Sequence, residues 1–268
     1  MFIKILLVLV SPVFLLFLSF ILHLLYFIIF KGERFSGSAL PAKKVSFFRK
    51  VFFKFPYQFW IDRINATPGE FQEYGLHLFC GEQGSGKTTA VVELLQRMSA
   101  KYPQLKIRTN FHYSAENSPL GDWKDLVKNQ NGIYGQIEVI DEIQTWFNSN
   151  QSRNFPVEML TEISQQRKQR KMLVGTAQVF SRVAKPIREQ TTFVYLPMTL
   201  LGCLTIVRVS KPQFYDDEKI RFKKFIKTYF FVHDDKIRNA FDTYKKIEGM
   251  SESGFSVRHE FYPGGEKL

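Results

Sequence analysis

The chain has 268 residues, 45% of them hydrophobic, and a formal net charge of +12 at pH 7. This apolar content builds a buried core and excludes a disordered tail, and the length suits one sizeable domain or two small ones. The positive charge favours partners that carry phosphate, such as anionic lipid or nucleic acid. Its two cysteines stand in no CxxC spacing, so neither a zinc site nor a disulfide framework is indicated, as suits a reducing cytosol.

The amino-terminal segment is long and apolar. Lys4 and Lys31 bracket 26 residues without Asp, Glu, Lys or Arg, in which His23 is the titratable group. A bilayer core of about 30 Å needs roughly 20 helical residues, so we expect residues 1–31 to form a transmembrane helix. A signal peptide is the alternative, but its apolar region is normally only about 7 to 15 residues. A buried core helix is the other alternative.

Basic residues crowd the carboxyl-terminal side of this segment: Lys31, Arg34, Lys43, Lys44, Arg49, Lys50 and Lys54. Because positive flanks stay inside, we expect a single-pass protein of the cytoplasmic (inner) membrane with the rest of the chain in the cytoplasm. Residues 32–68 form a basic and aromatic juxtamembrane linker. Between Lys43 and Trp60 this pattern predicts either a collar in the lipid headgroup region or an amphipathic helix packed on the following domain.

After Pro68 the sequence alternates strands with helices. Strands are predicted at Leu76–Cys80, Lys106–Thr109, Gln136–Ile140, Met172–Thr176 and Thr192–Leu196, and helices at Lys87–Lys101, around Asp122–Lys128 and at Pro156–Arg170. This order predicts an α/β domain over 69–248, with a mainly parallel sheet and helices on both faces. A β-hairpin is expected at about 201–234, from strands at Cys203–Val209 and Lys227–Val232, before a tail at 249–268.

A complete nucleotide-binding loop follows the first of these strands. It matches GxxxxGK[ST] at every defined position, in Gly81, Glu82, Gln83, Gly84, Ser85, Gly86, Lys87 and Thr88, and Thr89 follows. Glycines let backbone N–H groups wrap phosphates, and the start of the next helix adds partial positive charge. We expect Lys87 to neutralise the β and γ phosphates of ATP and Thr88 to ligate Mg²⁺.

Two carboxylates end the strand Gln136–Ile140, as in a Walker B element. Asp141 is expected to hold Mg²⁺, and Glu142 to act as the general base toward the attacking water. The chain thus predicts a P-loop NTPase of the RecA/ASCE type. Gln178 follows the next strand, and parallel strands end at one edge, so it is a candidate sensor of the γ phosphate or an ordinary loop residue.

The stretch between Ile163 and Arg188 contains seven cations and no Asp or Glu: Arg167, Lys168, Arg170, Lys171, Arg182, Lys185 and Arg188. We expect them to flank the catalytic edge and meet nucleic-acid phosphates, with Arg182 and Arg188 as candidate arginine fingers, or to form a solvated basic face. The polar segment Phe147–Asn154 is predicted to be a flexible loop pointed into a pore.

With these residues assembled, the sequence resembles the zonular occludens toxin-like family, which includes inner-membrane assembly ATPases of filamentous phages. The resemblance covers about Leu76 to Glu248 and rests on the P-loop, on Ile140–Phe147, on Gly175–Gln178 and on Phe241–Tyr244. It implies kinship with the FtsK/HerA group of DNA-pumping ATPases. Their members form rings, place a glutamine after the strand that follows Walker B, and use arginine in trans.

The resulting expectation is a membrane-anchored, ring-forming ATPase that moves DNA in phage assembly, extrusion or packaging, with phage coat or assembly proteins as further partners. An ATPase of conjugative or plasmid DNA transfer is the alternative among motors. A membrane-tethered scaffold that binds ATP to recruit partners is the alternative outside them. Glu142 argues against the scaffold, because binding alone needs no general base.

Overall fold

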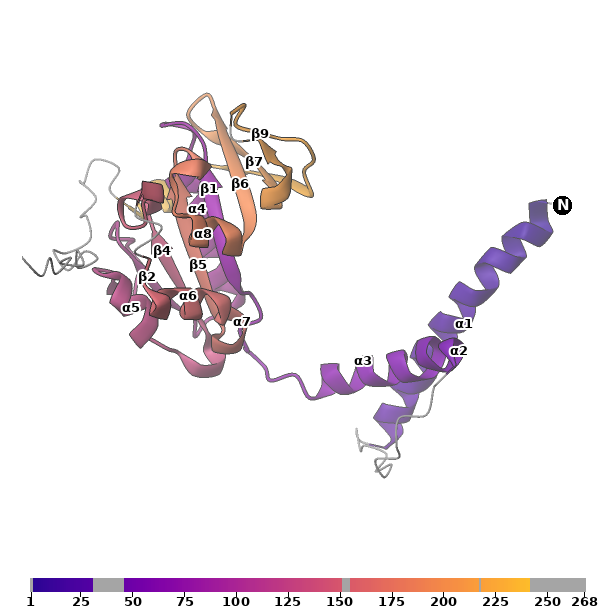
Figure 1. Ribbon diagram of the computed structural model, residues 1–268. Coiled ribbons are helices and arrows are strands. Elements are labelled where there is room, and N and C mark those ends of the chain that lie inside the picture. Colours follow the sequence, from indigo (N-terminus) through magenta and orange to yellow (C-terminus); the bar gives the residue numbers. More distant parts are fainter. Residues whose placement is uncertain (1, 31–45, 151–154, 217, 242–268) are drawn as a thin grey trace, which may run out of the picture. The chain divides into compact units, whose positions relative to one another are not determined.

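The computed structural model describes residues 2–30, 46–150, 155–216 and 218–241, with side chains from residue 12 onward. The chain divides into two compact units, Met1–Pro68 and Gly69–Leu268, coloured along the sequence in Figure 1. Several predicted segments lie outside the described residues: most of the linker before Ser46, residues 151–154, the motif residues after Phe241 and the tail at 249–268.

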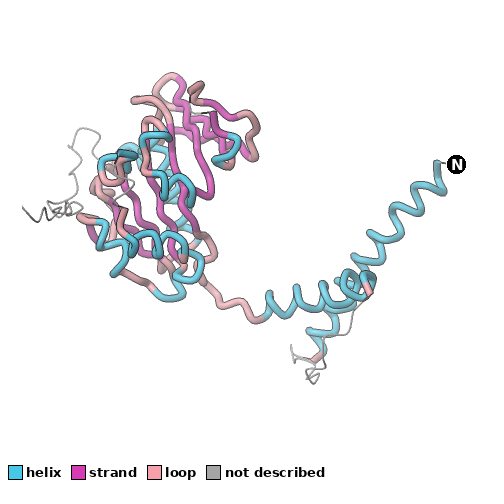
Figure 2. Tube along the Cα trace, in the orientation of Figure 1, coloured by secondary structure: helices cyan, strands magenta, loops and turns pink. Residues whose placement is uncertain are grey.

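The first unit consists of helices. The apolar segment forms α1 (Phe2–Ile29), and a second helical segment is made of α2 (Phe47–Arg49), the π-helical turn η1 (Lys50–Lys54) and α3 (Phe55–Ile64). We call residues 47–64 the crossing helix, because it packs across the carboxyl-terminal half of α1 (Figure 2). The sequence predicted either a membrane collar or a helix on the following domain for this segment, and neither prediction included the contact with α1.

Hydrogen bonds and rings join the two helices. Pro56 has no N–H to donate to the carbonyl of Phe52 four residues earlier, and the hydroxyl of Ser19 on α1 donates to that carbonyl instead. The indole of Trp60 donates to the carbonyl oxygen of Phe20 at 3.0 Å. Phe20 also meets the ring of Phe55 edge-on, with centroids 5.3 Å apart. The first unit thus has specific contacts of its own.

Among the described residues, α1 is the one helix long and apolar enough to cross a membrane, with a mean hydropathy of 2.5 over Pro12–Ile29. Most of its described side chains are exposed, and Phe27 is the buried exception. Since a signal sequence can meet the same criterion, membrane anchorage stays a prediction.

The second unit contains a mixed, mostly parallel sheet of the predicted class, with strand order β10-β7-β6-β1-β5-β4-β2-β3. Its strands are β1 (Gly75–Cys80), β2 (Lys106–Thr109), β3 (Ser118–Pro119), β4 (Gln136–Ile140), β5 (Lys171–Ala177), β6 (Thr191–Leu200), β7 (Leu204–Ser210) and β10 (Lys227–Val232). The pairs from β6 to β3 are parallel, and β7 is antiparallel to both its neighbours. A separate two-stranded sheet joins β8 (Tyr215–Asp216) to β9 (Arg221–Phe222).

Helices cover both faces of this sheet, as the βαβ pattern predicts (Figure 2). The helices are α4 (Lys87–Lys101), α5 (Trp123–Lys128), α6 (Val157–Ser164), α7 (Gln166–Gln169), α8 (Lys185–Gln190) and α9 (Asp235–Arg238), with short 3₁₀ turns η2 (Gly132–Tyr134), η3 (Ile143–Thr145), η5 (Phe180–Arg182) and η6 (Pro212–Phe214). The alternation in β1 shows the two cores: Phe79 packs on the α4 side, and Leu76 and Leu78 pack on the α5, α6 and α8 side.

Two predicted elements differ in form, and some short elements were not predicted. The predicted helix Pro156–Arg170 is interrupted at Gln165, whose N–H bonds to the carbonyls of both Thr161 and Glu162 and tightens the last turn of α6. The predicted hairpin is a three-stranded antiparallel extension, because β7 pairs with β6 as well as with β10. The short strand β3 and helix α8 carry too few residues for a periodic signal.

A buried charged group lies between β4, β5 and α6. Lys171 forms an ion pair with Glu162 and donates to the carbonyl oxygen of Leu126 at 2.8 Å. Glu138 lies nearby and accepts from the Gln136 amide at 2.9 Å. Burial raises the pKa of Glu138 to about 8, although Lys171 and Arg108 act in the opposite direction. A protonated Glu138 leaves the Lys171–Glu162 pair neutral overall.

This pKa predicts how stability depends on pH. In the unfolded chain the Glu138 carboxyl ionises near its ordinary value of 4.5, so between pH 4.5 and about 8 the folded chain binds more protons. The free energy of unfolding should therefore fall as pH rises through this window and level off above it. Glu138→Gln should flatten that slope in denaturant titrations, and exposed Glu158→Gln should leave it unchanged; equal slopes in all three proteins would contradict the prediction.

Candidate active site

The P-loop joins the end of β1 to the start of α4. Gly84 has φ +80° and Gly86 has φ +89°, a backbone conformation that favours glycine. A Cβ added at Gly86 would stand 2.2 Å from the Thr199 hydroxyl oxygen, so a larger residue is excluded by contact as well as by φ. Gly86 is the N-cap of α4, which aims the first N–H groups of this helix at the loop.

Lys87 is buried and folded back over this loop. Its Nζ donates to the carbonyl oxygen of Gly81 at 3.1 Å and to that of Glu82 at 3.0 Å. These two carbonyls satisfy an ammonium group whose burial would otherwise be costly. The loop therefore presents a cation that is held by exchangeable hydrogen bonds and has no carboxylate partner among the described residues.

Asp141 lies at the end of β4 with its carboxylate against the P-loop helix. The Thr88 hydroxyl lies 3.2 and 3.3 Å from the two carboxylate oxygens, and the Thr176 hydroxyl donates to Oδ1. Asn110, at the end of β2, brackets the backbone: its Oδ1 accepts from the Asp141 N–H at 2.7 Å, and its Nδ2 donates to the Asp141 carbonyl at 3.1 Å. Burial raises the pKa of Asp141, and the Thr176 hydroxyl opposes this.

Glu142 stands one residue further along, in a left-handed conformation with φ +53°. Its N–H donates to the Thr176 hydroxyl oxygen at 2.8 Å, and the side-chain amide of Gln144 donates to its carboxylate. A positive φ in a residue other than glycine is strained and persists where surrounding contacts impose it. Thr176 therefore orders both carboxylate-bearing residues, and the backbone at Glu142 turns away from the strand direction.

The strand register brings the predicted residues to one edge. β5 lies between β1 and β4, with Cys80 opposite Ala177 and Ile140 opposite Gly175. The P-loop, Asp141 and Gln178 thus follow three adjacent parallel strands at their carboxyl ends, as predicted. Gln178 is partly buried there, Arg182 is exposed in η5, and Arg188 is half-buried in α8 with its Nε unpartnered among the described residues. Their roles stay predictions.

The predicted position of the seven cations beside the catalytic edge is wrong for four of them. Arg167, Lys168, Arg170 and Lys171 precede β5 or begin it, so they lie at the amino-terminal edge of the sheet, a strand length of about 20 Å from the P-loop edge. Arg170 pairs with Glu70, and Lys171 pairs with Glu162, so these two are compensated as well. Proximity in sequence misled here because a buried strand separates the two groups of cations.

The predicted pore loop is also partly wrong. Phe147 is fully buried in the core, its carbonyl accepts from the Ala184 N–H at 2.8 Å, and Asn148 forms a β-bridge with Val183. The start of this segment is therefore anchored to the residues that follow β5, and residues 151–154 lie outside the described range.

A hydrogen-bonded relay supports the P-loop from the antiparallel extension. The Thr199 hydroxyl donates to the Ser85 carbonyl at 3.1 Å, Thr199 and Thr205 hydroxyls lie 2.7 Å apart, and Thr205 lies 2.7 Å from Nε2 of His233. Each hydroxyl has one proton, so Thr205 donates to Thr199 and His233 donates from Nε2. Burial and Arg238 lower the pKa of His233. No local motif marks these residues, which lie in β6, in β7 and directly after β10.

The relay predicts that Thr199→Val weakens ATP binding. The Ser85 carbonyl would lose its donor and the Thr205 hydroxyl its acceptor, at a cost of about 1–2 kcal/mol, or roughly tenfold in affinity. Nucleotide titration and thermal unfolding of Thr199→Val should show this loss in a folded protein, and exposed Thr228→Val on β10 is the matched control. Unchanged affinity in Thr199→Val would exclude a role for the relay in holding the loop.

The residues at this edge fit Mg²⁺ together with a nucleotide. Asp141 and Thr88 supply the oxygen ligands that Mg²⁺ prefers. Within the described ranges, no group of three His, Cys, Asp or Glu residues could hold a metal alone. This agrees with an ion that binds through one carboxylate, one hydroxyl, water and substrate phosphates.

A glycine loop between a buried parallel strand and a helix, beside a strand that ends in two carboxylates, defines a P-loop NTPase. The chain is accordingly an ATP-hydrolysing enzyme, and the family model described as ATPase family associated with various cellular activities (AAA) matches residues 77–198.

Solved structures with similarity to this chain include the N-terminal domain of zonular occludens toxin from Neisseria meningitidis, at 16% identity, covering 63% of this chain and 98% of that one, with a TM-score of 0.47. The DNA-packaging ATPase B204 from Sulfolobus turreted icosahedral virus is 11% identical, covering 57% and 97%, with a TM-score of 0.40. The flagellar accessory protein FlaH from Methanocaldococcus jannaschii is 14% identical, covering 57% and 83%, with a TM-score of 0.35. No curated protein matches the sequence.

Proposed function

We propose that this protein is a membrane-anchored motor that uses ATP hydrolysis to move DNA. The observation that carries the hydrolytic part is the convergence of the P-loop, Asp141 and Glu142 at one sheet edge, with Thr176 bonded to both acidic residues. A scaffold that only binds nucleotide would need the P-loop, but it would not need a second acidic residue, Glu142, held beside the loop by a strained backbone. Phage assembly, extrusion or packaging is the process that the sequence resemblance favours, and conjugative or plasmid DNA transfer is the alternative.

Each residue at the edge has a proposed role. Lys87 exchanges the Gly81 and Glu82 carbonyls for the β and γ phosphates, and the N–H groups of residues 81–89 cradle them. Thr88 and Asp141 hold Mg²⁺, which neutralises phosphate charge when bound. Glu142 accepts the proton of the attacking water, Gln178 senses the γ phosphate, and Arg182 or Arg188 acts on a neighbouring subunit of a ring.

Membrane anchorage by α1 is the second part of the proposal. The exposed apolar side chains over Pro12–Ile29 support it, because such a surface is stable in lipid and costly in water. The basic residues that follow favour a cytoplasmic position for the ATPase at the inner membrane. Resistance of the full chain to alkaline carbonate extraction from membranes is the expected result, and release into the soluble fraction would reject it.

Exposed cations support the DNA part. They gather in the stretch that joins β7 to β10, at the amino-terminal edge of the sheet, and include Lys211, Lys219, Arg221, Lys223, Lys224 and Lys227. Arg167 and Lys168 are exposed at the same edge, so the cations lie opposite the nucleotide edge and leave it free for hydrolysis.

DNA binding should then be salt-dependent and should stimulate hydrolysis. Replacing Lys223, Lys224 and Lys227 by Gln should reduce the slope of log binding constant against log salt concentration by about three, one for each lost phosphate contact. Lys124→Gln with Lys128→Gln on α5 should leave this slope unchanged. An ATPase rate indifferent to single- and double-stranded DNA, with no salt-dependent binding, would reject a DNA motor and leave the ATPase assignment intact.

A further inference from the structure

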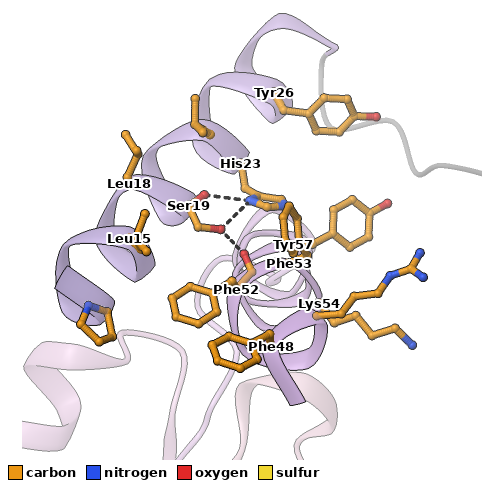
Figure 3. A pocket seen from close by; sticks show the side chains of 13 residues that line it. Leu15, Leu18, Ser19, His23, Tyr26, Phe48, Phe52, Phe53, Lys54 and Tyr57 are labelled. Carbon is orange, nitrogen blue, oxygen red and sulfur yellow. Dashed lines mark hydrogen bonds between the residues drawn. The ribbon is translucent and has the colours of Figure 1, made fainter. Parts of the chain in front are cut away.

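A groove of about 1120 Å³ lies where the crossing helix meets α1 (Figure 3). Its walls are mostly apolar, with Leu15 and Leu22 from α1 and Phe48 and Phe52 from the crossing helix. All lining residues belong to the first unit, so the groove does not depend on where the second unit sits. The bond from Ser19 to the Phe52 carbonyl holds the two walls together, and the apolar surface between them is open.

Two cations line the same groove. Arg49 and Lys54 both come from the crossing helix, and Figure 3 shows the Lys54 side chain extending away from α1. Residues 46–61 contain no Asp or Glu, and the next carboxylate, Asp62, accepts from Gln58 at 2.6 Å. An apolar cleft lined by cations that form no ion pair among the described residues complements a molecule with a long apolar part and a negative head.

We infer that this groove binds an anionic membrane lipid, with one acyl chain against the leucines and phenylalanines and the phosphate at Arg49 and Lys54. The guanidinium group of Arg49 can bind two phosphate oxygens at once, and the Lys54 ammonium adds a point charge. A soluble phosphate would leave the apolar walls exposed to water, so the lipid satisfies both halves of the site.

This inference rests on the proposed membrane anchorage and adds a lipid preference to it. α1 crosses the crossing helix between Ser19 and Phe27, near the end of α1 that the basic flank places at the cytoplasmic face. Phe47, Phe48 and Phe53 of the crossing helix are exposed and would meet lipid beside α1. The groove thus lies mostly along the half of α1 that is nearest the cytoplasmic leaflet.

The test uses the full chain purified from vesicles that hold equal parts of phosphatidylglycerol and phosphatidylcholine, with retained lipid counted by native mass spectrometry. Wild-type protein should retain phosphatidylglycerol selectively. Arg49→Gln with Lys54→Gln should lose this preference, by about fivefold for each cation. Lys50→Gln with Arg63→Gln removes the same charge from the same helix at positions that do not line the groove, and should keep it. Leu15→Trp fills the apolar part and should lower lipid retention without changing charge.

The outcomes separate a site from general attraction. Equal losses in both double variants would show attraction of a basic helix to any anionic surface and would overturn the site, as would no loss in either. Carbonate extraction of each variant checks insertion first. A chain that is not inserted rejects anchorage and this inference together, whereas an inserted chain without lipid preference rejects the lipid site alone.

Discussion

Glu142→Gln is expected to lower the rate of ATP hydrolysis by about 10²- to 10⁴-fold while ATP binding persists. Gln keeps the size of the side chain and one acceptor oxygen for the Gln144 amide, but it cannot accept the proton of the attacking water. The Glu142 N–H bond to Thr176 comes from the backbone, so the substitution leaves the strained turn intact. Steady-state phosphate release and nucleotide titration of the same preparation separate turnover from binding.

The matched control for this variant is Glu158→Gln, which makes the same chemical change at an exposed position of α6. It should hydrolyse ATP at the wild-type rate. Near-normal turnover in Glu142→Gln, with binding unchanged, would contradict the role of Glu142 as the general base and would favour the scaffold interpretation. Loss of both binding and turnover would point to a structural role at the turn.

Lys171→Met is expected to destabilise the second unit by about 3–5 kcal/mol. The substitution leaves the Glu162 carboxylate buried beside Glu138, and the Leu126 carbonyl loses the ammonium that donates to it at 2.8 Å. The Glu162 side chain is only 9% exposed, and the amide of Gln169, which donates to it at 2.8 Å, carries no charge, so the buried carboxylate would have no cation beside it. Chemical denaturation measured as the free energy of unfolding gives the magnitude.

Two controls isolate the charge from the packing. Lys168→Met makes the same change at an exposed position three residues earlier and should alter stability by no more than about 0.5 kcal/mol. Lys171→Met combined with Glu162→Leu removes both charges and should recover most of the loss, since apolar replacements of buried ion pairs are often neutral or stabilising. A double variant as unstable as the single one would show that packing, and not an unpaired charge, causes the effect.

Local sequence was sufficient for the class of fold and the centre of the site. The strand predicted at Gln136–Ile140 and the helix predicted at Lys87–Lys101 have the observed bounds, because each is a periodic apolar run ended by residues with a strong local signal. The P-loop could be recognised from the sequence because its glycines, Lys87 and Thr88 form one continuous segment. Asp141 and Glu142 could be assigned to the site because the carboxyl ends of parallel strands lie at one edge of the sheet.

Pairing over long distances decided what the sequence could not. Thr176, Asn110 and Thr199 touch the site from β5, β2 and β6, and single hydroxyl or amide residues in strands carry no pattern that marks such contacts. The position of the crossing helix could not be predicted either, because its aromatic and basic pattern fits several surfaces. Its hydrogen bonds with Ser19 and Phe20 show that it packs on α1.

The sequence alone determined a P-loop NTPase with an acidic Walker B strand, since those residues act within short, contiguous segments. Only the tertiary structure decided which charges face solvent and at which edge. Lys171 and Arg167 are close in sequence, yet one is buried in an ion pair and the other is exposed. The physical reason is that burial and pairing depend on which strands lie side by side, and that order follows from the packing of the whole sheet.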